Sequence, residues 1–202
     1  MKMLLSIAGI VLLAIAGGAV YVYGGWYDIG ADAAHSPVVY WFARTVRDRS
    51  IAARATDIGV PLLDDPKMLS IGAGQYATMC SGCHLAPGYD KDETWEGLYP
   101  RPPKLYEGTD LTPGEIFWVL KHGIKMSGMP AWGQTHDDEE LWAITAFVER
   151  LPKLDPQQYK DVVATAPADA DMTMMPMPGR GDVVPELDLP NGVKEAPMPV
   201  PH

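Results

Sequence analysis

The sequence predicts an all-α protein, and three observations support that prediction. Apolar residues recur at helical spacing in the segments 36–55, 66–84, 112–122 and 137–151. Each of these segments begins at or next to a Ser, Thr or Asp that can cap a helix, followed by Pro or by an acidic residue. No segment shows a sustained alternation of apolar and polar residues that would indicate a confident strand.

The first element is an apolar segment at the amino terminus. Met3 to Val22 runs without a charged residue, and at about 1.5 Å per residue such a helix covers a hydrocarbon core of roughly 30 Å. Lys2 precedes the segment, and an aromatic cluster follows it up to Tyr27. We expect residues 1–27 to be an uncleaved transmembrane anchor. The alternative is a cleaved signal peptide, although the apolar run is longer than usual for one.

A second region, residues 28–65, is predicted to be a juxtamembrane helix with a connector. Ser36-Pro37 pairs an N-cap with a proline at the first helical position, and the helix should reach about Ala55. It is amphipathic and carries several arginines. It therefore packs on the following domain or on a partner subunit, or else its arginines meet anionic head groups at a membrane surface.

The third region, residues 66–152, alternates predicted helices with irregular loops. Asp65-Pro66 starts a helix by the same cap and proline signal, and Thr112 to Glu115 is a capping box. Asp137 and Asp138 begin the last firm helix, which should end before Pro152. The loops between these helices are 85–108 and 123–134.

The last region, residues 153–202, is predicted to be an extended tail without a core of its own. From about Pro167 it consists mostly of Pro, Asp, Met, Val and Gly with no period. Its sulfur and imidazole groups suit Cu(I), so one hypothesis is that the tail handles copper. The other is that the tail docks on a partner or on the chain's own domain. The residues concerned are Met172, Met174, Met175, Met177, Met198 and His202.

The chain is acidic, with 16 Lys and Arg against 26 Asp and Glu and a formal net charge of −10. Such a balance argues against nucleic acid as a partner, because nucleic-acid binding depends on basic surfaces that neutralise phosphates. It permits a partner protein that has a basic docking face.

The most specific motif is the pentapeptide Cys80-Ser81-Gly82-Cys83-His84. Its spacing, C-x-x-C-H, is the attachment signature of a c-type haem: two thiols add to the two vinyl groups, and the following histidine can ligate the iron. The chain has no other cysteine. The alternative is a redox C-x-x-C motif, which needs a βαβ setting that the surrounding helical pattern does not offer.

The region 66–152 resembles a class I cytochrome c, a family of mono-haem, all-α domains. In that family the first helix carries a glycine and an aromatic residue eight and four positions before the first haem cysteine, and Gly72 and Tyr76 match them. The resemblance implies that this helix crosses the carboxy-terminal helix at the glycine. Trp142 and Phe147 are the candidates for aromatic contacts at that crossing.

The resemblance also implies the first iron ligand and its support. His84 would ligate the iron through Nε2, and its other ring nitrogen would donate to a proline carbonyl in a Pro-x-Leu segment. Pro103-Lys104-Leu105 matches that segment, with the carbonyl of Pro102 as an adjacent competitor.

The sixth ligand decides the function of such a haem. The segment from Met126 to Trp132 resembles the axial-methionine loop of the family, in which Met precedes Pro, so Met129 is the candidate and Met126 the runner-up. Ligation by two histidines, with His122 or His136, remains an alternative. Residues that could contact the haem propionates are Trp132, Arg101 and Lys104.

A haem with both axial positions filled by protein exchanges one electron and offers no site for a substrate. We therefore expect one covalent haem c, electron transfer and no catalysis by the chain alone. The expected location is the periplasmic side of a bacterial cytoplasmic membrane, as a subunit of or carrier for a respiratory oxidase or dehydrogenase, where Lys121 and Lys125 could be docking charges. The alternatives are a haem peroxidase or gas sensor with a labile sixth ligand, and a copper-handling protein that uses the tail.

Overall fold

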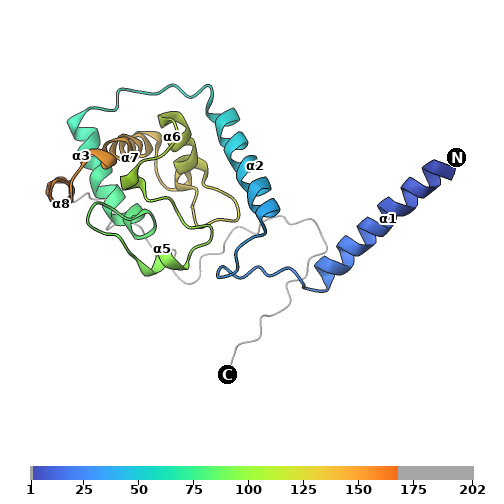
Figure 1. Ribbon diagram of the computed structural model, residues 1–202. Helices are drawn as coiled ribbons and strands as arrows, with labels where there is room; N and C mark the ends of the chain where they lie inside the picture. Colours follow the sequence, from blue (N-terminus) through green and yellow to red (C-terminus); the bar gives the residue numbers. More distant parts are fainter. Residues whose placement is uncertain (1, 168–202) are drawn as a thin grey trace, which may run out of the picture. The chain divides into compact units, whose positions relative to one another are not determined.

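The structure is a computed structural model that describes residues 2–167, and within that range it is helical without a strand. The prediction of an all-α fold is confirmed. The only β pairing in this range is an isolated bridge between Ala86 and Tyr89. The helical elements are α1 (Lys2–Tyr23), α2 (Pro37–Ala55), α3 (Pro66–Gln75), η1 (Tyr76–Cys80), α4 (Ser81–His84), α5 (Glu93–Gly97), η2 (Leu105–Glu107), α6 (Pro113–His122), η3 (Trp132–Gln134), α7 (Asp138–Arg150), η4 (Leu151–Lys153) and α8 (Pro156–Ala164) (Figure 1).

The core is organised around the crossing of α3 and α7, which Figure 1 shows side by side. Gly72 of α3 is buried at the crossing, where an added Cβ would overlap the carbonyl oxygen of Ala143 and lie 2.9 Å from the Cβ of Phe147. The ring of Tyr76 packs against Phe147 with 5.6 Å between centroids. A glycine at this position therefore lets the two helix backbones touch.

Trp142 does not take part in this crossing, contrary to our expectation. Its ring stacks on Phe117 of α6, with centroids 4.1 Å apart and planes 11° apart. Residues 142 and 147 lie five positions apart on α7, which places them about 140° apart around the helix. One aromatic residue therefore faces α3 and the other faces α6.

The predicted helix starts agree with the caps that the structure forms. The Asp65 side chain accepts from the backbone N–H of Lys67 at 2.8 Å. The capping box of α6 is complete, because the Glu115 carboxylate accepts from the backbone N–H of Thr112 at 2.8 Å and the Thr112 hydroxyl accepts from the backbone N–H of Glu115 at 3.4 Å. The Asp137 capping box of α7 is complete as well. These signals are local and therefore readable from sequence.

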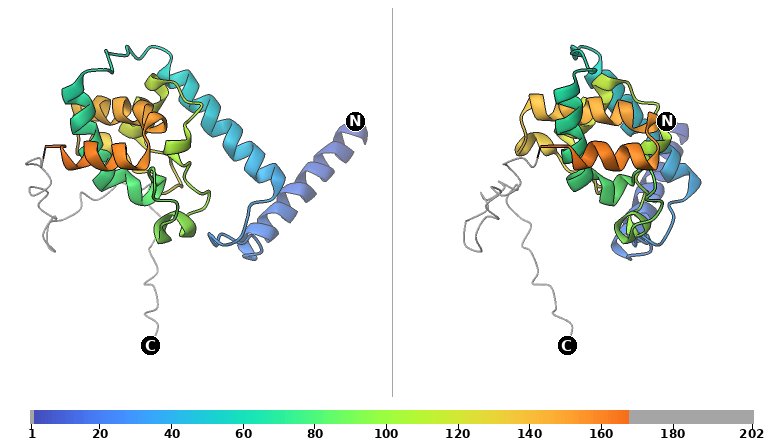
Figure 2. Two further views of the ribbon diagram at one scale, coloured as in Figure 1. Left: turned by 60° about the vertical axis from the view of Figure 1, so that its left-hand side comes forward. Right: turned by 90° about the vertical axis from the view of Figure 1, so that its left-hand side faces the viewer.

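Residues 153–167 are not extended, which corrects the predicted boundary of the tail. Helix α8 begins at an Asp155-Pro156 cap, and Tyr159 in its second turn is buried in the core cluster, 6.3 Å from the ring of Phe147. Figure 2 shows α8 beside α3. The prolines around residue 152 looked like a chain terminator, whereas a proline at the first helical position starts a helix. The tail methionines and His202 lie outside the described residues.

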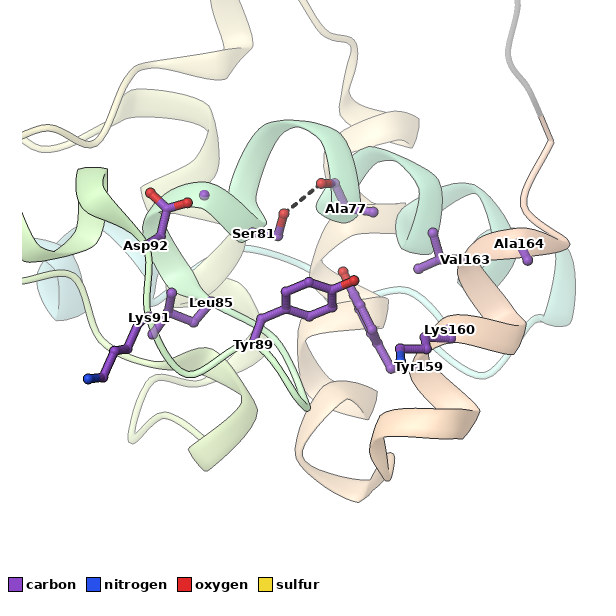
Figure 3. A pocket seen from close by; sticks show the side chains of 11 residues that line it. Ala77, Ser81, Leu85, Tyr89, Lys91, Asp92, Tyr159, Lys160, Val163 and Ala164 are labelled. Carbon is purple, nitrogen blue, oxygen red and sulfur yellow. Dashed lines mark hydrogen bonds between the residues drawn. The ribbon is translucent and has the colours of Figure 1, made fainter.

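Helix α8 also forms one wall of an open groove of about 460 Å³ on the outer side of the Cys-x-x-Cys turn. Figure 3 shows Tyr89 from the loop and Tyr159 from α8 facing each other there, with Ser81 on the opposite wall. The lining contains neither His84 nor Met129. The groove is therefore separate from the residues predicted to ligate iron.

The two amino-terminal helices differ in composition. Helix α1 is 22 residues long, contains an 18-residue stretch with a mean hydropathy of 2.5 and has no buried residue, so by length and composition it is able to cross a membrane. Helix α2 starts at the predicted Ser36 cap and packs on α6 through its carboxy-terminal half, where Ile51 and Ala55 are buried.

Candidate functional site

The Cys-x-x-Cys-His segment follows α3 through a π-helical turn. In η1 the backbone N–H of Ser81 bonds to the carbonyl of Tyr76, five residues back, and the helix then tightens into α4. The turn inserts one residue into the helical repeat and keeps both Tyr76 and Cys80 buried. The first cysteine therefore faces the core while the second, Cys83, is only half-buried.

The two cysteines are free thiols, and both are hard to ionise. Burial raises the pKa of Cys80 to about 12, with the neighbouring Cys83 adding to the effect. Burial also raises the pKa of Cys83, and the charge of Asp92 acts in the same direction. Cysteines of redox Cys-x-x-Cys motifs have the opposite property, a lowered pKa that favours the thiolate. The helical setting of the motif, without a βαβ unit among the described residues, also differs from that of a redox Cys-x-x-Cys domain.

The turn after His84 is held in an uncommon backbone conformation. Leu85 has φ of +59°, a value that non-glycine residues rarely adopt, yet its side chain is fully buried. The buried hydroxyl of Tyr76 donates to the Leu85 carbonyl at 2.6 Å. Burial and this hydrogen bond together overcome the strain, so Tyr76 ties the helix to the chain that leaves the motif.

The imidazole of His84 is oriented by a proline carbonyl. Its Nδ1 lies 2.8 Å from the Pro103 oxygen, and because a carbonyl only accepts, Nδ1 carries the proton. Burial lowers the pKa of His84, and the hydrogen bond to Pro103 opposes that shift. Within residues 2–167 the Nε2 atom has no hydrogen-bond partner. A neutral imidazole with Nδ1 committed and Nε2 free is the form that ligates a metal.

The neighbouring carbonyl of Pro102 is occupied by another donor. The indole Nε1 of Trp95 donates to it at 2.9 Å. Two cations flank the same indole: the guanidinium of Arg101 lies 4.9 Å from the ring centroid and the ammonium of Lys104 lies 5.2 Å from it. Trp95 thus anchors the segment that presents Pro103 to His84. Arg101 and Lys104, expected near the propionates, are both placed at this indole.

The two methionines of the second loop have different surroundings. Met126 is fully exposed at a φ of +57°. Met129 is half-buried and packs against the core cluster, and its backbone carbonyl accepts from the N–H of Ile124 at 3.1 Å. The structure thus distinguishes the candidate from the runner-up by burial.

Gly123 sets the position of this loop at the end of α6. It has a φ of +63°, and an added Cβ would lie 2.8 Å from the carbonyl oxygen of Met129 and 2.7 Å from the carbonyl carbon of Pro130. The backbone of the methionine segment therefore rests directly on the helix end, where only glycine fits.

The remaining candidates in and beside this loop have different partners. Trp132 is half-buried against the core, and its ring meets His136 edge-on at 5.5 Å. His122 lies 4.9 Å from the ring of Trp118. Lys121, considered as a docking charge, forms a salt bridge with Asp138 at 2.6 Å, whereas Lys125 is exposed.

Sequence reasoning missed the role of Trp95 and the π-helical turn. Trp95 lies in α5, a helix of five residues within a loop that has no apolar period, so no pattern indicated a contact seven residues away. The π-turn depends on one backbone bond that leaves no mark in composition. Knowledge of the tertiary packing was needed for both.

Comparison with protein families gives one match. The model of the family described as cytochrome C oxidase, cbb3-type, subunit III matches residues 68–148, which run from the first turn of α3 to the last turn of α7. Comparison with curated proteins and with solved structures gives no match.

Proposed function

We propose that this chain, whose residues 68–148 form a c-type cytochrome domain of the mono-haem class, transfers single electrons through one haem bound covalently at Cys80 and Cys83. The observation that carries the proposal is the hydrogen bond between His84 Nδ1 and the Pro103 carbonyl, 2.8 Å long. It prepares the Nε2 atom as a ligand immediately after the two thiols.

A haem held here would supply reversible one-electron exchange at its iron. The chain's own residues do the rest. Thioethers formed by Cys80 and Cys83 would hold the group, and the Nε2 atom of His84 would ligate the iron. The half-buried thioether of Met129 would be the second ligand of the iron; it is a soft, neutral group that would favour the reduced state relative to a second histidine.

This ligand set supports electron transfer over catalysis, because it leaves no coordination position for a substrate. Trp132 and Arg101 are proposed to lie near the propionates, with Arg101 held beside Trp95. The haem peroxidase and gas-sensor readings need a labile sixth ligand, which the packing of Met129 on the core argues against.

We propose that α1 anchors the protein in a bacterial cytoplasmic membrane with the haem domain on the periplasmic side. The support is the length and hydropathy of α1 and the requirement that c-type haem be attached outside the cytoplasm. A respiratory complex of the oxidase or dehydrogenase type is the proposed partner. In support, the description of the matched family names a subunit of such an oxidase.

Attachment is tested on the full chain, produced in a host that matures c-type cytochromes. We expect a c-type absorption band after reduction and a denatured mass increased by a single haem. A variant with both cysteines replaced by Ala should hold no haem after denaturation. Haem that is extracted from the wild-type chain by acid solvent would contradict covalent attachment.

The sixth ligand is tested by carbon monoxide binding to the reduced protein. We expect slow or incomplete binding in the wild type and in Met126→Ala, the matched control, and rapid, complete binding in Met129→Ala. Rapid binding in the wild type would instead support the sensor or peroxidase function. If only Met126→Ala bound carbon monoxide rapidly, Met126 and not Met129 would be the ligand.

A further inference from the structure

Helix α2 has two apolar faces, and only one of them is packed. Its inner face contacts α6 through Ile51, which is 3 % exposed. Phe42 lies nine residues earlier, and at 100° per residue it points about 180° away from Ile51. Phe42 is 62 % exposed. It shares its side of the helix with Val38 and Val46, four residues to either side, which are 73 % and 52 % exposed.

The outer face of the amino-terminal half therefore forms an apolar stripe, which we call the outer stripe of α2: Val38, Phe42 and Val46, with Trp41 at its edge and 65 % exposed. Arg49 follows on the same side of the helix, about 20° from Phe42. Large apolar side chains grouped on one helix face in contact with solvent are a sign of an interaction surface. Within residues 2–167 no other element covers the stripe.

The charge of α2 is opposite to that of the chain. The helix carries four arginines, at 44, 47, 49 and 54, and one acidic residue, Asp48, for a net charge of +3. The chain as a whole has a net charge of −10, so the rest of it carries −13. Arg44 and Arg47 both contact Asp48, at 3.5 and 2.7 Å, which leaves positive charge in excess.

The short segment that joins α1 to α2 limits where α2 can lie. Thirteen residues, 24–36, separate the end of α1 from the start of α2. Fully extended, they span at most about 45 Å, at roughly 3.5 Å per residue. If α1 spans a membrane, the start of α2 stays within that distance of the surface. A basic amphipathic helix with Trp and Phe on its apolar face, close to a membrane, is the type that binds at the interface.

We propose that α2 lies in the membrane interface, with its outer stripe against the acyl chains and with Arg49 at the end of the stripe, and Arg47 and Arg54 on its flank, at anionic phosphates. Because Ile51 faces the opposite way and packs on α6, this orientation places the haem domain on the water side of α2. The rest of the chain is negatively charged, so anionic lipid repels it and also favours the haem domain on the water side. This inference rests on the membrane anchoring proposed above.

The test uses the full-length haem-loaded chain in vesicles and two variants that each add one cysteine, Phe42→Cys on the outer stripe and Tyr40→Cys as the matched control; Cys80 and Cys83 are taken up by the haem. Tyr40 is an exposed aromatic residue on the same helix, about 160° from Phe42 around it. A charged, membrane-impermeant maleimide reacts with the added thiol, and the intact mass gives the rate. Phosphatidylcholine vesicles are compared with vesicles that also contain phosphatidylglycerol.

We expect phosphatidylglycerol to slow labelling at position 42 severalfold and to leave position 40 unchanged. Equal, rapid labelling of both positions in both vesicles would overturn the inference. So would protection of position 42 in native membranes but not in vesicles, because it would assign the stripe to a protein partner. Flotation of the vesicles after alkaline extraction tests α1 separately. If the chain floats while position 42 reacts freely, the membrane anchor is supported and only the orientation of α2 is refuted. If the chain does not float, both proposals fail.

Discussion

Replacement of Gly72 by Ala should separate the two helices that form the core. The added Cβ would overlap the carbonyl oxygen of Ala143 and lie 2.6 Å from its carbonyl carbon and 2.9 Å from the Cβ of Phe147. Carbon atoms in contact prefer about 3.5–4.0 Å. Two of the three contacts are with backbone, which no rotamer change relieves, so α3 and α7 must move apart by about 1 Å.

Two effects set the size of the loss. Overpacking of a well-packed core costs about 1–3 kcal/mol, whereas Ala gains about 0.5–1 kcal/mol over Gly in a helix interior. Because the clash is with backbone, we take the upper part of the first range. We therefore expect a net loss of about 2 kcal/mol in the free energy of unfolding.

The measurement is urea unfolding of the haem-loaded chain in detergent, followed by far-ultraviolet circular dichroism. Gly74→Ala is the matched control, since this residue lies in the same helix and its added Cβ would meet only the side chain of Ala166, at 3.2 Å, and the Pro167 oxygen, at 3.8 Å. The control should be unchanged or slightly stabilised. If Gly72→Ala were as stable as Gly74→Ala, the close approach of the helices would be wrong.

Three further substitutions test the loops and α8. Gly123→Ala introduces a Cβ against the backbone of Met129, so the ferric protein should lose the near-infrared methionine-to-iron absorption; retention of that absorption would show that Gly123 does not set the position of the methionine loop. Trp95→Phe removes the 2.9 Å hydrogen bond to the Pro102 carbonyl, which should cost about 1 kcal/mol and shift the reduction potential in a potentiometric titration, because the next carbonyl orients the histidine ligand. An unchanged potential would show that the indole is only structural. Burial raises the pKa of Tyr159 to about 12, above the usual value near 10. The unfolded chain therefore loses this proton before the folded chain does, so the contribution of Tyr159 to stability is present below about pH 10 and is lost as the pH rises toward 12. Tyr159→Phe cannot ionise, so its urea midpoint should fall less than that of the wild type between about pH 9 and pH 11; equal falls would refute this.

Helix starts were predictable because capping is local. The side chains of Asp65, Thr112 and Asp137 bond to backbone groups two or three residues away, so the pattern alone located α3, α6 and α7. The same signal exists at Asp155, whose side chain accepts from the N–H groups of residues 157 and 158. The sequence does not indicate that this cap starts a packed helix, because prolines also follow the ends of folded domains and the burial of Tyr159 depends on distant segments.

Contacts between distant segments were not predictable to the same degree. The resemblance implied a proline carbonyl for His84 but left two adjacent ones open. The choice follows from Trp95, whose indole bonds to Pro102 and leaves Pro103 for the imidazole. The two methionines of the loop also look alike in sequence, and burial against the core separates Met129 from Met126.

The sequence by itself determined the features that depend on neighbouring residues: the Cys-x-x-Cys-His motif, the apolar length of α1 and the caps of the main helices. The tertiary structure decided which carbonyl supports His84, which aromatic residue of α7 faces α3, and that α8 completes the core. It also decided that one face of α2 has no partner among the described residues. Spacing specifies local hydrogen bonds, whereas these outcomes depend on which segments pack together and exclude water.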